Sequence, residues 1–98
     1  MLSVVCPVYN EAENIERLMD ELAAKVSVPM EVLIVYDRED DNTIPVVQEI
    51  AAKYPFEIRL VKNIYGYGAL NAIKTGFEES HHEAVLVVIA DLSDDLTV

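Results

Sequence analysis

The chain has 98 residues, a hydrophobic content of 52% and a net charge of −11 at neutral pH. This length allows one domain with one modest core, and this hydrophobic content excludes a wholly disordered chain. The strong negative charge excludes a general nucleic-acid-binding protein, because such a protein needs a basic surface.

Cysteine usage and hydropathy indicate the compartment. Cys6 is the only cysteine, so the chain forms no disulfide within itself, which fits a reducing compartment. The longest apolar run covers residues 84–90. A membrane-spanning helix needs about 20 apolar residues. We therefore expect a cytoplasmic segment that makes no membrane contact.

Residues 2–25 predict a strand followed by a helix. Residues 2–6 form an apolar run with β-branched side chains, and Pro7 stops it. Asn10 is placed to accept a hydrogen bond from the first helical turn, and Glu13, three residues later, to return it. Apolar residues at helical spacing then predict a helix over residues 11–25, with a buried stripe of Ile15, Leu18, Met19, Leu22, Ala23 and Val26.

The next segment repeats this order. Residues 32–35 form a continuous apolar run, as expected of a strand covered on both faces. An acidic loop over residues 36–43 follows, in which Asn42 or Thr43 is placed to cap a second helix. That helix must end near Tyr54, because Pro55 follows. Its predicted buried face consists of Val46, Val47, Ile50 and Ala51.

The last segment predicts two strands around a third helix. Residues 56–60 alternate between apolar and charged side chains, which predicts a strand at the sheet edge. A glycine-containing loop over residues 63–68 leads into a helix over residues 69–79. Gly76 inside this helix indicates close packing on the sheet. The apolar stripe of this helix is predicted to consist of Leu70, Ile73 and Phe77. Residues 84–90 then predict a buried fourth strand.

Four strands that alternate with three helices predict an α/β fold with a parallel sheet and right-handed crossovers. The carboxyl ends of the strands then share one edge, where such sheets bind ligands. Residues 9–11, 37–41 and 91–95 would gather there. Carboxylates at two strand ends suit a hard cation such as Mg²⁺. The alternative for Asp40, Asp94 and Asp95 is that they are ordinary solvated loop acids.

Four segments carry a family resemblance. Residues 5–15, VCPVYNEAENI, resemble the opening of the family-two inverting glycosyltransferases, especially the branch similar to dolichyl-phosphate mannosyltransferases. Residues 35–43 resemble the block V-D-D-G-S-x-D-x-T, with Tyr36 and Arg38 in place of its first aspartate and its glycine. Residues 63–71 resemble the third block, and residues 89–93 fall where the family carries a D-x-D metal motif, with Ile89 in place of its first aspartate.

The resemblance implies a fold and an activity. It implies the nucleotide-sugar-binding half of a catalytic domain over residues 1–98, a truncated glycosyltransferase A-type fold. This would be a three-layer, Rossmann-like half-domain with a parallel sheet in the order 3-2-1-4. The ligand would be a nucleotide diphosphate sugar, bound with a divalent metal (Mg or Mn). No catalytic base is expected in this fragment, so it should not transfer sugar alone. Membrane association would belong to other parts of the parent protein, on the cytoplasmic side.

The resemblance also assigns roles to residues. Asp37 would bond the base, Asp91 would hold the divalent cation, and Gly66 and Gly68 would let the backbone approach the nucleotide sugar. The other residues placed at the nucleotide are Pro7, Tyr9, Asn10, Glu11 and Ala90.

Two alternatives stay open from the residues alone: a receiver-like Mg-binding signalling domain and a non-catalytic α/β interaction module. A receiver needs an acidic pair after its first strand, where this chain has Pro7 to Asn10. The sequence also predicts a homodimer through the fourth strand, because residues 84–90 would form an edge without proline or charge. Cys6 is interpreted as a core thiol and the pair His81–His82 as a solvated turn, whereas Tyr65 and Tyr67 either stack on a ligand or pack on the domain.

Overall fold

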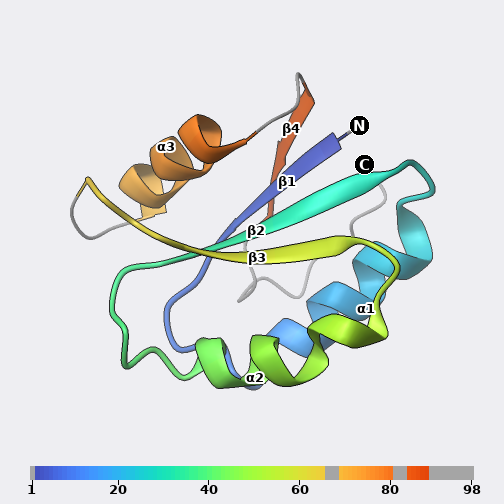
Figure 1. Ribbon diagram of the computed structural model, residues 1–98, viewed down its shortest axis with the longest axis horizontal. Helices are drawn as coiled ribbons and strands as arrows, with labels where there is room; N and C mark the ends of the chain where they lie inside the picture. The colour runs from blue at the N-terminus through green and yellow to red at the C-terminus, as the bar shows by residue number, and fades with distance from the viewer. Residues whose placement is uncertain (1, 66–68, 81–83, 89–98) are drawn as a thin grey trace.

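The structure is a computed structural model of the chain, and it describes residues 2–65, 69–80 and 84–88 (Figure 1). Strands and helices alternate along this described part, as the sequence predicts. The elements are β1 (Leu2–Pro7), α1 (Ile15–Lys25), β2 (Met30–Tyr36), α2 (Thr43–Ile50) with a 3-10 turn (Ala51–Lys53), β3 (Glu57–Lys62), α3 (Ala69–Glu79) and β4 (Ala84–Val87).

The four strands form one parallel sheet in the order β3-β2-β1-β4. Helices α1 and α2 cover one face and α3 covers the other, which gives three layers (Figure 1). The predicted fold class, strand order and edge position of β3 are therefore confirmed. The described part contains no helix that is both long and apolar enough to cross a bilayer.

The alternation of side chains along the central strands divides the core between the two faces. Val4 and Cys6 of β1 belong to the larger cluster under α1 and α2, whereas Val5 belongs to a smaller cluster under α3. Cys6 is fully buried, so its interpretation as a core thiol is confirmed. Burial of each large aliphatic side chain contributes about 1.5–3 kcal/mol, so the thicker α1/α2 face supplies most of the hydrophobic stabilisation.

Helix α1 begins later than the sequence predicts. It starts at Ile15, and Asn14 precedes it without a side-chain capping bond. The predicted capping role of Asn10 is wrong, because its Oδ1 accepts a bond from the N–H of Asn42 at 3.1 Å and its φ is 52°. The Asn10 side chain thus binds a backbone N–H of the β2–α2 loop instead of one in the first turn of α1. Ala23, which was expected in the buried stripe, is exposed.

Helix α3 has the predicted bounds but buries a different face. Over residues 70–79, the buried residues are Ala72, Thr75 and Gly76, while Leu70 and Phe77 are 80% and 53% exposed. A Cβ built on Gly76 would lie 2.4 Å from Cγ1 of Val5. The helix approaches the sheet so closely at Gly76 that only small side chains fit there, and Leu70 and Phe77 turn outward while Ile73 is half-buried. The packing predicted from Gly76 is confirmed, and the predicted apolar stripe is wrong at Leu70 and Phe77.

Candidate functional site

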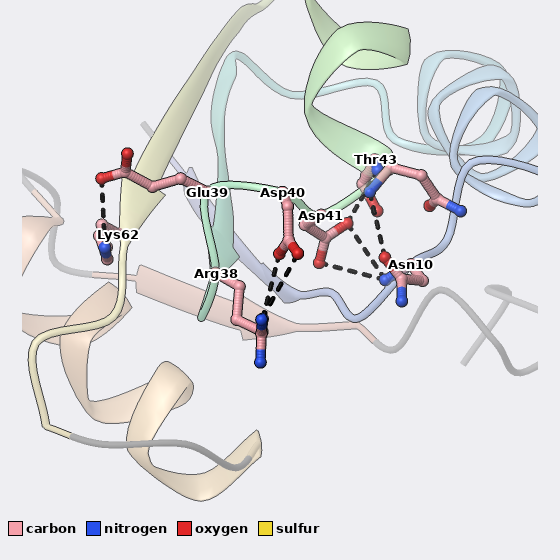
Figure 2. Close-up of polar contacts among 8 residues, drawn as sticks. Asn10, Arg38, Glu39, Asp40, Asp41, Thr43 and Lys62 are labelled. Carbon is pink, nitrogen blue, oxygen red and sulfur yellow. Dashed lines mark hydrogen bonds and ion pairs between the residues drawn. The ribbon is translucent and has the colours of Figure 1, made fainter.

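The loops after β1 and β2 lie side by side at the carboxyl end of the sheet (Figure 2). Together they line a pocket of about 160 Å³, and its walls are Tyr9, Asn10, Arg38, Asp40 and Asp41. This is the position where open parallel sheets bind their ligands. Residues that are about 30 positions apart in the sequence thus form one surface.

Asp41 joins the two loops from a buried position. Its side chain is 4% exposed, and both of its carboxylate oxygens accept the N–H of Asn10 at 3.1 Å. Oδ1 also accepts the N–H of Thr43 at 2.8 Å, which satisfies a donor at the start of α2 (Figure 2). Asp41 therefore acts as a structural clamp on both loops, a role that the sequence did not assign to it.

Two further side chains continue this clamp. Thr43 Oγ1 accepts the N–H of Glu11 at 2.8 Å, and Asn42 Oδ1 accepts the N–H of Ala12 at 3.1 Å. The three successive N–H groups of residues 10–12 thus all donate to side chains of the β2–α2 loop or of the first residue of α2. Backbone N–H groups at such a turn often bind phosphate. Here they are already engaged, so this corner suits an uncharged part of a ligand.

Asp37 lies at the other side of the same loop, directly after β2. Its carboxylate is half-buried, and Oδ1 accepts a bond from Nδ2 of Asn63 at 2.8 Å. It faces a shallow hollow of about 360 Å³, which is lined by Asp37, Arg38, Glu39, Asp40 and Lys62. The end of β3 thus fixes one oxygen of the acid that was predicted to bind the base.

Two exposed ion pairs border this hollow (Figure 2). Nε of Arg38 lies 3.1 Å from Oδ1 of Asp40, and Nζ of Lys62 lies 3.2 Å from Oε1 of Glu39. The hydrogen bond from Arg38, followed by its positive charge, lowers the pKa of Asp40 below its ordinary value. The Asp40 side chain is 72% exposed, in agreement with the solvated-loop alternative.

The remaining predicted site residues are placed as follows. Pro7 is buried at the end of β1, Tyr9 is 67% exposed at the pocket, and Glu11 Oε1 accepts a bond from Nδ2 of Asn14 at 2.9 Å. Tyr65 packs on α3, because its hydroxyl donates to Glu78 and its ring lies 4.4 Å from Nζ of Lys74. The predictions for Gly66, Tyr67, Gly68, His81, His82, Ala90 and Asp91 lie outside the described residues.

The described residues do not themselves assemble a metal site. Within residues 2–65, 69–80 and 84–88, no group of three His, Cys, Asp or Glu side chains is arranged to hold an ion. The metal assignment therefore continues to depend on Asp91.

A second hollow lies at the opposite, amino-terminal end of the sheet. It measures about 480 Å³, and its lining residues are Ala23, Val26, Ser27, Val28, Pro29, Met30, Glu31, Pro55, Phe56 and Glu57. It is larger than the pocket at the carboxyl end, but only two of its lining residues are charged. Size alone would favour this hollow, whereas the chemistry of the lining residues favours the other.

Comparisons with known proteins identify a family whose sequences match nearly the whole chain. Residues 3–96 match the sequence model of glycosyl transferase family 2. Dolichol-phosphate mannosyltransferase of Pyrococcus furiosus is 33% identical over 93% of this chain and 26% of its own length. Undecaprenyl-phosphate 4-deoxy-4-formamido-L-arabinose transferase of Pectobacterium atrosepticum is 32% identical over 95% of this chain and 29% of its own length. The chain thus spans less than a third of these relatives.

Solved structures give the same picture. The mannosyltransferase PcManGT from Pyrobaculum calidifontis, in complex with GDP-Man and Mn²⁺, superposes with a TM-score of 0.80 at 28% identity, over 92% of this chain and 27% of its own. S. aureus TarS 1-349 in complex with UDP superposes with a TM-score of 0.76 at 25% identity, over 92% and 27% of the two chains.

Proposed function

The chain belongs to glycosyl transferase family 2, and from this premise we propose that its 98 residues form the nucleotide-sugar-binding half of a transferase catalytic domain. The ligand would be a nucleotide diphosphate sugar. The parent enzyme would transfer the sugar with inversion, when an acceptor hydroxyl displaces the diphosphate. No residue of this chain is proposed as the base that activates the acceptor.

The observation that carries this proposal is the interlock of the two loops. It brings Tyr9 and Asn10 of one loop and Arg38 of the other to the walls of one pocket, and the N–H groups of residues 10–12 are already bonded within the protein. A base or ribose fits such a corner better than a diphosphate does. Asp37, a half-buried acceptor that lines the neighbouring hollow, would accept an N–H of the base.

The relatives support a donor of this class. PcManGT was solved with GDP-Man and Mn²⁺, and TarS with UDP. For this chain we propose a divalent cation, Mg²⁺ or Mn²⁺, held at Asp91, where it would neutralise charge on the diphosphate. The single buried cysteine accords with work on the cytoplasmic side.

Calorimetry tests the proposal directly. The chain is titrated with UDP and with GDP in the presence of MgCl₂. We expect saturable binding of at least one, and at least a tenfold loss in Asp37→Asn. Glu49→Gln, which removes one exposed carboxylate on α2, is the matched control and should bind like the wild type. A chain that binds neither nucleotide would contradict the proposal and favour a non-catalytic α/β module.

The metal is tested separately. We expect nucleotide affinity to fall sharply in EDTA and in Asp91→Asn. Equal affinities with Mg²⁺ and with EDTA would remove the metal assignment while leaving the nucleotide proposal in place. Because the chain covers about a quarter of its relatives, we also expect it to bind donor without transferring sugar to an added acceptor.

A further inference from the structure

Asn63 connects three elements at the carboxyl end of the sheet. It follows β3 directly, is 8% exposed, and donates its backbone N–H to the carbonyl oxygen of Tyr36 at 2.8 Å. Its side-chain Oδ1 accepts the Thr75 hydroxyl of α3 at 2.9 Å and the N–H of Tyr65 at 3.0 Å. One amide thus joins the end of β2, the β3–α3 loop and the buried face of α3.

These contacts fix the orientation of the Asn63 amide. If its oxygen and nitrogen exchanged places, the NH₂ group would face the N–H of Tyr65, and two donors would oppose each other. Thr75 is 1% exposed, and its oxygen also accepts the N–H of Ile64 at 3.3 Å. Its one hydroxyl hydrogen is shared between Asn63 Oδ1 at 2.9 Å and the carbonyl oxygen of Asn71 at 3.1 Å, so the N–H of Tyr65 decides the orientation of the amide. With its oxygen held in this way, the Nδ2 group of Asn63 faces Asp37 and donates to its Oδ1 at 2.8 Å.

We propose that Asn63 is a positioning residue that orients the Asp37 carboxylate toward the nucleotide base and thereby sets base selectivity. The inference rests on the proposed function. The bond from Asn63 to Oδ1 fixes the plane of the carboxylate, and with it the direction in which Oδ2 presents its lone pairs. A carboxylate accepts hydrogen bonds only. Uracil and guanine offer a ring N–H to such an acceptor, whereas the corresponding ring nitrogens of cytosine and adenine are themselves acceptors.

The surroundings define a substitution that keeps the shape but removes the donor. In Asn63→Asp, a second carboxyl group would stand within hydrogen-bond distance of Asp37. Two carboxylates at that distance retain a shared proton at mildly acidic pH, and this proton replaces the lost amide hydrogen. The other charged groups around Asp37 are Arg38, Glu39, Asp40 and Lys62 in the hollow; across the β3–α3 loop, Lys74 and Glu78 contact Tyr65.

The experiment compares affinity ratios. Binding of UDP, GDP, CDP and ADP with MgCl₂ is measured by calorimetry at pH 7.5 and pH 5.5 for the wild-type chain and Asn63→Asp. We expect the wild type to favour UDP or GDP over CDP and ADP at both pH values. In the variant, the ratio of affinities for UDP or GDP over CDP and ADP should fall at least tenfold at pH 7.5 and recover most of its wild-type value at pH 5.5. Ratios cancel the titration of the diphosphate itself.

Two further variants make the result specific. Gln48→Glu adds the same charge on the exposed face of α2 and should leave the ratios unchanged. Thr75→Val keeps the buried shape but removes the hydroxyl that holds the Asn63 oxygen, and it should reduce the preference severalfold without a pH-dependent recovery. Wild-type ratios in both Asn63→Asp and Thr75→Val would overturn the inference and leave the proposed function intact. A wild-type chain that binds none of the four nucleotides would remove both.

Discussion

Asp37 and Asp41 belong to one loop, yet the structure uses them differently. Asp41 is 4% exposed and accepts the backbone N–H groups of Asn10 and Thr43. Asp37 is half-buried, and it accepts a side-chain amide from Asn63 beside an open hollow. The difference separates a carboxylate that holds two loops together from one that, in our proposal, binds the nucleotide base. Burial and the type of donor distinguish them in the structure, whereas the family resemblance assigned a role to Asp37 and none to Asp41.

The largest expected effect on stability comes from removing the carboxylate of Asp41. Asp41→Ala leaves the N–H groups of Asn10 and Thr43 without their acceptor, and each such group costs about 1–3 kcal/mol when buried. We expect a loss of roughly 2–4 kcal/mol in the free energy of unfolding, measured with urea. Asp37→Ala should cost only about 1 kcal/mol while abolishing nucleotide binding. Equal destabilisation by the two variants would contradict the distinction.

A second prediction concerns the packing of α3 on the sheet. This helix carries Thr75, which bonds Asn63, the residue that in turn donates to Asp37. Gly76→Ala forces a Cβ to within 2.4 Å of Cγ1 of Val5, a stiff and fully buried side chain. Overpacking of this kind costs about 1–3 kcal/mol. Thermal unfolding should show the loss, and nucleotide selectivity should weaken with it. Ala72→Gly is a matched change at a buried position of the same helix, and it should act through helix propensity without moving α3 from the sheet.

A third prediction concerns self-association, which we expect to occur through β4 and to involve neither Asp37 nor Asp41. In the described part, β4 pairs with β1 alone and exposes 41% of Leu86. We propose that two copies pair through this edge, as the sequence predicts. Leu86→Lys should weaken the dimer at least tenfold in sedimentation velocity and leave nucleotide affinity unchanged. Val87→Lys should weaken it too, but Val87 packs against the core, so this variant also disturbs folding. A wild-type monomer at micromolar concentration would exclude the dimer.

The smallest expected effect concerns the exposed neighbour of Asp41. Arg38 lowers the pKa of Asp40, so the pair stabilises the fold above the unfolded-state pKa of about 4. This contribution is lost as the pH falls through the lower folded-state value. Asp40→Asn should therefore change stability slightly at pH 7 and not at all near pH 2, and added salt should remove the difference at pH 7. A loss as large as that of Asp41→Ala would contradict the assignment of Asp40 to the solvated surface.

The fold could be predicted from the sequence because the apolar runs of the central strands and the helical spacing of α1 are local patterns. The face of α3 could not, because the close approach at Gly76 overrides the apparent stripe through Leu70 and Phe77. Asp37 was found through a family resemblance. The roles of Asp41 and Thr43 in joining the two loops could not be predicted, because their partners lie about 30 residues away and no local sequence pattern indicates these bonds.

The most direct test of the account is a titration of the ¹⁵N-labelled chain with UDP or GDP and MgCl₂, followed by amide chemical shifts. The account predicts that the largest changes occur at Tyr9, Asp37 and Arg38, around the pocket and hollow at the carboxyl end of the sheet. Changes concentrated at Val28 and Phe56, around the larger hollow at the amino-terminal end, would contradict it.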